Sequence, residues 1–185
     1  MTATAHLAIA FALDLAFGDP RWLPHPVKLI GKLAASLEAP VRHVISNARL
    51  AGVVTACAVV ASAALGAYAL TGAARHLHPL AGDAVSILLL YTSFAARDLA
   101  GHAATVARAL RAGNLDLARR NVARMVGRDT EALDEAGVAR AAAESVAENT
   151  VDGVTAPLFF AALGGPVLAM AYKAASTLDS TFGYK

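Results

Sequence analysis

The sequence predicts an all-α, polytopic membrane protein with a small helical cytoplasmic domain. Of its 185 residues, 57% are hydrophobic and only 16% are charged, whereas a soluble domain usually carries about 25% charged residues. Several apolar stretches approach the length of a bilayer core, and the basic residues gather in two of the segments between them. The length suits one domain. The net charge of +2, without a dense basic run, does not indicate a nucleic-acid partner.

The first apolar stretch covers residues 2–17. No basic residue precedes it and Asp14 interrupts it, so it lacks the positively charged start of a secretory signal peptide. We therefore predict that the stretch is retained, either as a membrane segment or as an interfacial helix. Because a carboxylate is costly in lipid, we expect Asp14, near the end of the stretch, to lie at the membrane interface.

Residues 19–49 are predicted to form a basic, Pro-rich cytoplasmic loop. Three prolines lie close together at its start. Each restricts its own backbone and that of the preceding residue, so this part of the loop is stiff and extended. Asp19, Arg21 and His25 belong to the stiff part. Either they present polar groups to a charged ligand, or the loop is only a membrane-surface anchor.

Two longer spans are predicted at residues 50–71 and 80–96. The first holds no charged residue, and at ~1.5 Å per residue it is roughly as long as the ~30 Å hydrocarbon core. Its small residues allow close helix–helix contact. The second is apolar through Ile87–Tyr91 and carries Asp83 near its start, where we again expect the carboxylate at the membrane interface.

Residues 154–185 are predicted to form a broken membrane segment followed by the start of a further polar motif. The apolar part, residues 154–172, contains Pro157 and the run Gly164–Pro166. Such interruptions leave backbone groups unpaired, which at membrane depth is tolerated only beside protein or a wet cavity. This segment is therefore either a kinked span or a re-entrant hairpin.

The basic residues predict the orientation of the chain. Residues 19–49 contain five Lys and Arg residues, residues 97–153 contain eight, and residues 72–79 contain one. Because spans alternate between the two sides of a membrane, the first and third segments lie on the same side. They are also the basic segments, which places both of them in the cytoplasm.

Residues 97–153 are predicted to form a helical domain rather than a linker. Apolar residues recur at helical spacing from Leu99 to Leu110, which indicates a first helix with one buried face. Caps and glycines suggest two more helices after it. The expected ends are Gly113 for the first helix, Asn114 and Gly127 for the second, and Asp129 and Asn149 for the third.

A row of acidic residues is the most informative polar pattern. Glu144, Glu148 and Asp152 follow Arg140 at intervals of four residues, which places them on one helix face or just beyond its end. Like charges at this spacing repel each other by roughly 0.2–0.5 kcal/mol. Arg140 can offset the repulsion by pairing with Glu144. Alternatively, the row binds a divalent cation such as Mg²⁺, which prefers oxygen ligands.

Other polar residues are candidates of lower rank. Lys173 and Asp179 follow the broken segment, and lysines there either snorkel to the membrane surface or bind phosphate as point charges. Asp129 follows Arg128 and is explained equally by helix capping. The sequence contains no Gly-rich phosphate loop of the Walker type, no dinucleotide fingerprint and no metalloprotease helix motif.

Four stretches carry a resemblance to a known family. They are LDLAFGDPRWLPHPVKLIGK from Leu13, VGRDTEALDE from Val126, ESVAENTVDGVTAPLFF from Glu144 and AYKAASTLDSTFGYK from Ala171. Together they resemble the adenosylcobinamide-phosphate synthase family of cobalamin biosynthesis. The four motifs occur in the family's order and are spread over nearly the whole chain.

The resemblance implies an enzyme of the cell inner membrane that crosses it several times. Such enzymes join adenosylcobyric acid to aminopropanol, or to aminopropanol phosphate, through an amide bond and with ATP and Mg²⁺. The implied partners are this corrinoid, the amine, membrane lipid and other cobalamin-pathway enzymes. Onto the motif positions we assign Glu144, Glu148 and Asp152 as catalytic and Mg²⁺-holding residues. The substrate-binding assignments are Asp19, Arg21, His25, Arg128, Asp129, Asn149, Lys173 and Asp179.

The chain departs from the family pattern in two respects. Family members run well beyond this length, and the chain stops at Lys185 within a motif, so we expect a truncated protein. Ser176 stands where the family often has Asn, so a side-chain amide is absent at that position. Lys28 stands where the family often has Arg, so a guanidinium that could bind in a bidentate way is absent there. Two other classes stay open: a non-catalytic membrane scaffold for corrinoid enzymes, and a transporter with a broken span.

Overall fold

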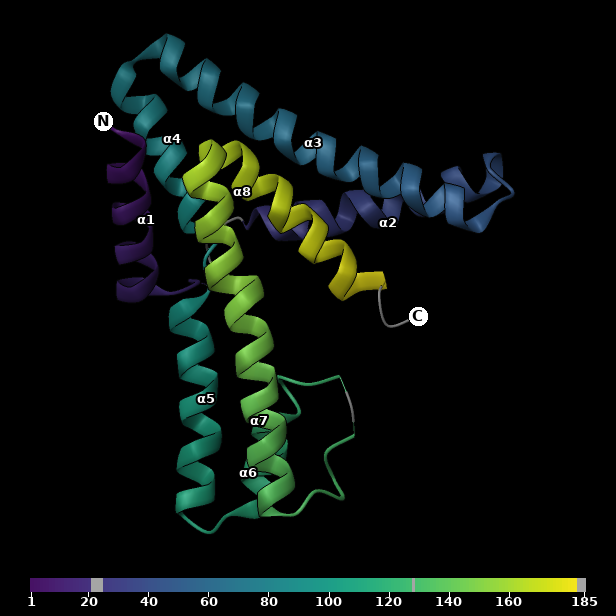
Figure 1. Cartoon of the computed structure of the whole chain (residues 1–185), viewed down its shortest axis with the longest axis vertical. Coiled ribbons are helices and arrows are strands. Elements are labelled where there is room, and N and C mark those ends of the chain that lie inside the picture. Colours follow the sequence, from purple (N-terminus) through teal and green to yellow (C-terminus); the bar gives the residue numbers. More distant parts are fainter. Residues whose placement is uncertain (21–24, 128, 183–185) are drawn as a thin grey trace.

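A computed structural model describes residues 1–20, 25–127 and 129–182. Every regular element in these ranges is a helix, which confirms the all-α prediction. An upper body holds the first four helices and the last, and a lower arm holds the rest (Figure 1). The elements are α1 (Ala3–Phe17), α2 (Pro26–Val44), α3 (Ala48–Leu77), α4 (Pro79–Tyr91), α5 (Ala96–Arg111), α6 (Leu115–Val122), α7 (Glu135–Thr150), the π-helix η1 (Val151–Thr155) and α8 (Ala156–Phe182).

Helix α8 is the centre of the upper body. It packs against α1, α2, α3 and α4. One apolar cluster, around Leu90 and Phe94, lies between α1, α4 and α8. A second cluster, around Ile30 and Val59, joins α2, α3 and α8. Many of the buried contacts are alanines, which lets the helices approach one another closely.

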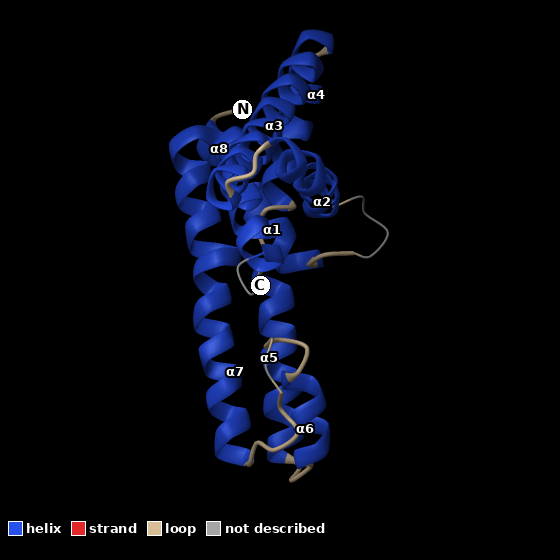
Figure 2. Cartoon of the chain, turned by 90° about the vertical axis from the view of Figure 1, so that its right-hand side faces the viewer, coloured by secondary structure: helices blue, strands red, loops and turns tan. Residues whose placement is uncertain are grey.

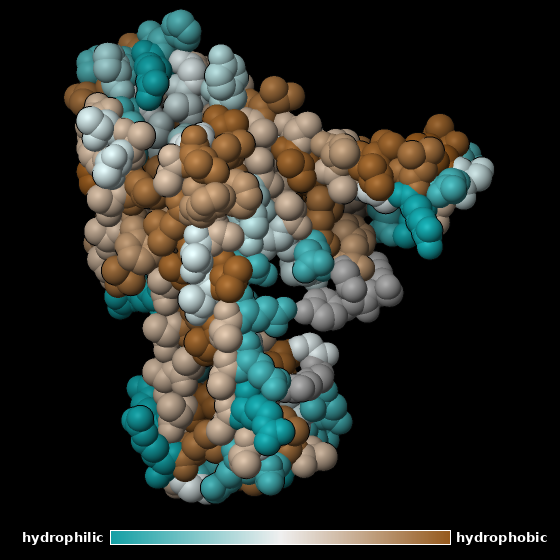
Figure 3. Space-filling view, viewed as in Figure 1, coloured by the Kyte–Doolittle hydropathy of each residue, from teal (hydrophilic) through white to brown (hydrophobic). Residues whose placement is uncertain are grey.

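Three helical stretches are long and apolar enough to cross a membrane: Ala48–Leu77, Pro79–Arg111 and Glu135–Phe182. The expected spans at 50–71 and 80–96 lie within the first two of them. Apolar side chains cover much of the visible surface of the upper body, and hydrophilic ones gather towards the end of the lower arm (Figure 3). Helix α1 is also apolar, but with 15 residues it is about 23 Å long and shorter than a bilayer core.

The prediction of a loop over residues 19–49 is corrected in part, because Pro26–Val44 form helix α2. Proline at the first helical position loses no hydrogen bond and has a suitable backbone angle. His25 precedes it as the N-cap, and its Nδ1 accepts a hydrogen bond from the backbone N–H of Val27 at 3.4 Å. The helix buries Ile30 against α3 and α8. Local patterns of proline and charge do not indicate this packing.

The lower arm has an apolar core of its own, formed by α5, α6 and α7 around Val106, Val122 and Val138. The 90° view shows α5 and α7 running side by side along the arm (Figure 2). Asn114 caps α6 as expected, and its Oδ1 accepts from the N–H of Leu117 at 2.9 Å. Helix α7 begins at Glu135 instead of Asp129, because Asp134 is the residue that caps it.

A sharp turn at Gly164 and Gly165 divides α8 into two arms, and the chain reverses direction within the upper body, below α3 in the view of Figure 1. Gly165 has a φ of 59°, a region that favours glycine. A Cβ atom on Gly164 would lie 2.4 Å from Cγ of Leu168. The predicted break within residues 154–172 is therefore present at the glycine pair. Pro157 does not interrupt the helix.

Candidate functional site

A polar cleft with two lobes lies where the lower arm meets the upper body. The α5 lobe, a cavity of about 350 Å³, is lined from α5, α7, η1 and α8 by residues that include Asp98, His102, Arg124 and Lys173. The acidic lobe, of about 530 Å³, opens between α7 and α8 beside Glu144, Glu148 and Asp179. The two lobes share a wall formed by Met125, Ser145, Asn149, Asp152, Ser176 and Ser180.

The acidic lobe brings together the carboxylates that the sequence singled out. Glu144 and Glu148 line it from α7, Asp152 from η1 and Asp179 from α8. The two glutamates and Asp179 are exposed, whereas Asp152 is half-buried. The spacing of four residues thus places the row on one side of α7, as helical geometry requires. Asp179 joins it from a helix that is distant in sequence.

The carboxylates do not form a metal cage by themselves. Within the three described ranges, no three His, Cys, Asp or Glu side chains lie close enough together to hold a metal ion. Magnesium is usually bound by one or two carboxylates together with substrate phosphates and water. Glu144, Glu148 and Asp152 therefore fit a Mg²⁺ ion that arrives with phosphates better than a resident ion held by protein alone.

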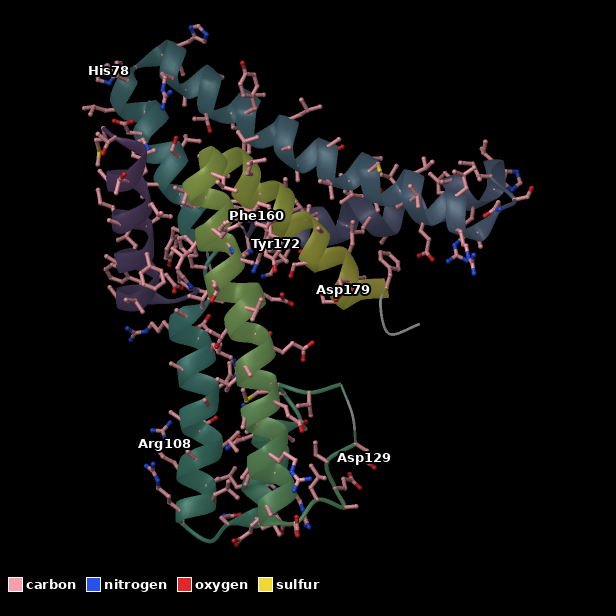
Figure 4. The ribbon with its side chains drawn as sticks, viewed as in Figure 1. His78, Arg108, Asp129, Phe160, Tyr172 and Asp179 are labelled. Atoms are coloured by element: carbon pink, nitrogen blue, oxygen red, sulfur yellow. The ribbon has the colours of Figure 1, made fainter. Side chains whose placement is uncertain are left out.

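The π-helix positions Asp152 at the shared wall. Such widened turns are frequent at functional sites, and here the carbonyl of Gly153 accepts a hydrogen bond from the N–H of Ala95 at 3.0 Å. The hydroxyl of Tyr172 donates to Oδ1 of Asp152 at 2.9 Å. The Tyr172 ring stacks on Phe160, with centroids 5.0 Å apart (Figure 4). The carboxylate of Asp152 is therefore held by a tyrosine that is itself held by packing.

Lys173 follows Tyr172 on α8 and lines the α5 lobe. Its side chain is partly buried, and its ammonium is attracted by the carboxylates of Asp19, Asp152 and Asp14. These acids come from three separate elements. The structure therefore brings the lysine of the fourth motif together with acidic residues of the first and third motifs.

The end of α1 and the start of α5 cap each other. Oδ2 of Asp14 accepts from the N–H of Ala96 at 2.9 Å, a bond that the N-cap residue of α5 does not provide. Arg97 donates in return to the carbonyls of Leu15 and Ala16, at 2.8 and 2.7 Å. The negative charge lies at a helix N-terminus and the positive charge at a C-terminus, so both complement the helix dipoles.

This α1–α5 junction also holds the start of the first motif. The hydroxyl of Tyr91 donates to the carbonyl of Gly18, and the N–H of Asp19 donates to Oδ2 of Asp98 at 3.2 Å. Nε2 of His25 lies 3.1 Å from Oδ1 of Asp19. Asp19 and His25 are thus fixed to each other and to α5, beside the α5 lobe.

Two acidic residues of the apolar stretches are buried against other helices. Asp14 is only 1% exposed, because it serves as the cap of α5. Asp83 is buried as well, and its Oδ1 lies 2.8 Å from Nε2 of His6. In both cases a specific polar partner in another helix makes burial of the carboxylate tolerable.

The other predicted site residues are placed as follows. Asn149 belongs to the shared wall, where its amide donates to the carbonyl of Ser145 at 2.8 Å. Asp129 lies on the exposed connection between α6 and α7 (Figure 4), outside the lining of both lobes. Its Oδ1 accepts from the N–H of Glu131 at 3.0 Å, a local turn. Arg21 and Arg128 lie outside the described residues.

Sequence reasoning missed three residues of the cleft, Asp98, His102 and Arg124, and also Tyr172, which bonds to Asp152 in its wall. Tyr172 had one local signal, because it adjoins Lys173 within the fourth motif. Asp98 and His102 belong to α5, and Arg124 follows the end of α6. No local pattern connects them with α8, because only the folding of the lower arm against the upper body brings them there.

The apolar helices and the cleft together define an all-α membrane protein whose polar site lies where a helical arm meets the helices of the upper body. Comparison with known proteins gives the family of the chain. The chain belongs to the family described as CobD/Cbib protein, whose model matches residues 7–185. The resemblance drawn from the four motifs is thereby confirmed.

Several curated relatives are similar over nearly the whole chain. The Cobalamin biosynthesis protein CobD of Pelobacter propionicus is 51% identical over 179 residues, which are 97% of this chain and 55% of the relative. That of Geobacter metallireducens is 51% identical over 183 residues, 99% of this chain and 58% of the relative. Cobalamin biosynthesis protein CbiB of Salmonella typhimurium is 44% identical over 180 residues, 96% of this chain and 56% of the relative.

The chain thus spans about half the length of the curated relatives it matches. No solved structure matches it.

Proposed function

We propose that the full-length protein acts in cobalamin biosynthesis and forms the amide bond between adenosylcobyric acid and aminopropanol or aminopropanol phosphate, with ATP and Mg²⁺. The names of the relatives support the pathway. The observation that carries the reaction is the cleft, in which the lobe lined by four carboxylates shares a wall with the lobe lined by Lys173 and Arg124. Carboxylates for a metal ion and cations for phosphates are what ATP-dependent acyl activation needs.

The reaction requires the corrinoid carboxylate to be activated. A carboxylate oxygen attacks the γ-phosphorus of ATP, the bond to the bridging oxygen breaks, and ADP leaves. The amine nitrogen then attacks the carbonyl carbon of the acyl phosphate, the C–O bond to phosphorus breaks, and phosphate leaves while the nitrogen loses a proton. Mg²⁺ would neutralise phosphate charge, with Glu144, Glu148 and Asp152 to hold it. Lys173 stabilises charge on the transferred phosphoryl group.

The remaining assigned residues bind substrate in this proposal. Asp19 and His25 are held at the α1–α5 junction, while Asn149 and Asp179 line the acidic lobe. The protein lies in the inner membrane with residues 19–49 and 97–153 in the cytoplasm, where ATP is available. The three apolar stretches and the distribution of basic residues support this placement.

The proposal is tested with membranes that contain the full-length protein. Adenosylcobyric acid, aminopropanol phosphate, ATP and Mg²⁺ are added, and the amide product is measured by mass spectrometry. We expect product with both ATP and Mg²⁺ present, none after EDTA, and recovery when excess Mg²⁺ is restored. Well-expressed protein that forms no product under any of these conditions would favour the scaffold, in which the exposed acidic row is a docking face.

Tyr172→Phe is expected to lower turnover about tenfold without loss of folded protein. The variant loses the hydrogen bond to Asp152 but keeps the ring stacked on Phe160. A hydrogen bond to a charged group contributes about 1.5–3 kcal/mol, and about 1.4 kcal/mol corresponds to a factor of ten. Rates of product formation and thermal unfolding are measured together. Tyr68→Phe, at an exposed position on α3, is the matched control, and equal rates for both variants would contradict the role of Tyr172.

A further inference from the structure

The two lobes of the cleft differ in charge although they share a wall. The acidic lobe is lined by Glu144, Glu148, Asp152 and Asp179, and its described lining contains no Lys or Arg. The groups that carry or accept positive charge, His102, Arg124 and Lys173, line the α5 lobe. The α5 lobe also holds two carboxylates, Asp98 and Asp152, so among the described residues the lobes differ in that only the α5 lobe offers cationic groups to an anionic ligand.

The cationic groups of the α5 lobe have side-chain donors that are not used in short-range bonds, although the ammonium of Lys173 is attracted by Asp19, Asp152 and Asp14. Among the described residues, the side chains of His102, Arg124 and Lys173 form no hydrogen bond or ion pair. Two other arginines are engaged: Arg97 donates to carbonyls of α1, and Arg119 donates to the carbonyl of Leu133 at 2.7 Å. The α5 lobe thus gathers side-chain donors that are available to a ligand.

The two carboxylates of the same lobe are already hydrogen-bonded. Oδ2 of Asp98 accepts from the N–H of Asp19 at 3.2 Å, and Oδ1 of Asp152 accepts from the hydroxyl of Tyr172 at 2.9 Å. These bonds fix both carboxylates at the walls of the lobe. The two carboxylates are thus held in place at the walls. The donors that remain for a ligand belong to the three cationic groups and to the hydroxyl of Ser176 in the shared wall.

We propose that the α5 lobe is a phosphoryl-binding subsite in which His102, Arg124 and Lys173 hold the oxygens of a phosphate group. Arginine binds phosphate through a planar fork of donors, and lysine binds it as a point charge. The volume of about 350 Å³ is within the usual range for small-ligand sites. Where the ligand is aminopropanol phosphate, its ammonium end would then point into the acidic lobe.

The inference rests on the proposed function for the identity of the ligand, since aminopropanol phosphate and ATP both carry phosphoryl groups. Purified full-length protein is titrated by calorimetry with aminopropanol phosphate, with ATP and with unphosphorylated aminopropanol. The variants are Arg124→Gln and His102→Gln. The matched control is Arg108→Gln, because Arg108 is exposed on α5 (Figure 4) and outside both lobes. Circular dichroism verifies that each variant is folded.

We expect Arg124→Gln to weaken binding of a phosphorylated ligand about tenfold, which is the loss of one charge-assisted contact. His102→Gln weakens it less, and Arg108→Gln and the binding of aminopropanol stay unchanged. If the variants lose affinity for aminopropanol phosphate but not for ATP, the phosphate of the amine is the occupant. If they lose affinity for ATP but not for aminopropanol phosphate, the nucleotide is the occupant. Either result supports the subsite.

Two results would overturn it. If the wild type binds the phosphorylated ligands, and Arg124→Gln and His102→Gln bind them as tightly as Arg108→Gln does, the subsite is wrong while the proposed function stands. If the folded wild-type protein binds neither phosphorylated ligand, the subsite fails together with the proposed function.

Discussion

Glu148→Gln in the full-length protein is expected to abolish amide formation while leaving the amount of protein in the membrane unchanged. Glu148 is exposed on α7 and lines the acidic lobe, so its replacement disturbs no core packing. The change removes one negative charge at a position where we propose that Mg²⁺ and phosphates bind. Loss of a single electrostatic contact in an active site typically costs about 100-fold to 1,000-fold in rate.

Mass spectrometry of the corrinoid product and an immunoblot of the membranes measure the two quantities. Glu131→Gln is the matched control, because Glu131 is equally exposed but lies on the α6–α7 connection, outside the lining of the cleft. We expect it to retain wild-type turnover. Near-normal turnover of Glu148→Gln would remove Glu148 from the site and would leave Asp152, held by Tyr172, as the main candidate of the row.

Gly18→Ala is expected to be the most damaging small substitution at the α1–α5 junction. Gly18 has a φ of 62° and a ψ of −148°, a region that is nearly restricted to glycine and costs other residues about 1–3 kcal/mol. Its new Cβ atom would also lie 2.9 Å from Oδ1 of Asp98 and 3.0 Å from Cδ of Arg97. Both side chains would have to move, and they are the ones that hold Asp19 and the end of α1.

The expected result is a lower unfolding temperature together with a loss of turnover, because Asp19 would shift relative to Lys173. Both are measured on full-length protein in the same detergent. Gly31→Ala makes the same chemical change within α2, where no atom lies within 4 Å of the new Cβ and alanine is the better helix former. A Gly18→Ala protein as stable and active as Gly31→Ala would show that the junction tolerates displacement.

The apolar helices were predictable because their signals are local. The uncharged stretch of α3 and the turn at Gly164 and Gly165 depend on residues adjacent in sequence, and the structure agrees with both. Helix α2 was not predicted, because the contacts that support it are remote in sequence. Its prolines and charges resemble a loop, whereas its helical state is supported by burial of Ile30 against α3 and α8, which are far away in the chain.

The candidate site likewise has one part that local sequence predicted and another part that it did not. A spacing of four residues is sufficient to align Glu144, Glu148 and Asp152 along α7, because a helix repeats every 3.6 residues. Nothing local indicated that Asp14 would cap α5 or that Tyr172 would bond to Asp152. Each of these contacts joins residues that only the packing of separate helices brings within hydrogen-bonding distance.

The sequence by itself therefore determined the all-α membrane class, the family and the acidic face of α7. The tertiary structure alone decided which partners these residues have. It brought Lys173 and Arg124 to one lobe and four carboxylates to the other, and it made Asp14 a buried cap. The physical reason is that hydropathy and helical periodicity act between near neighbours in sequence, whereas a cleft forms where helices remote in sequence pack together.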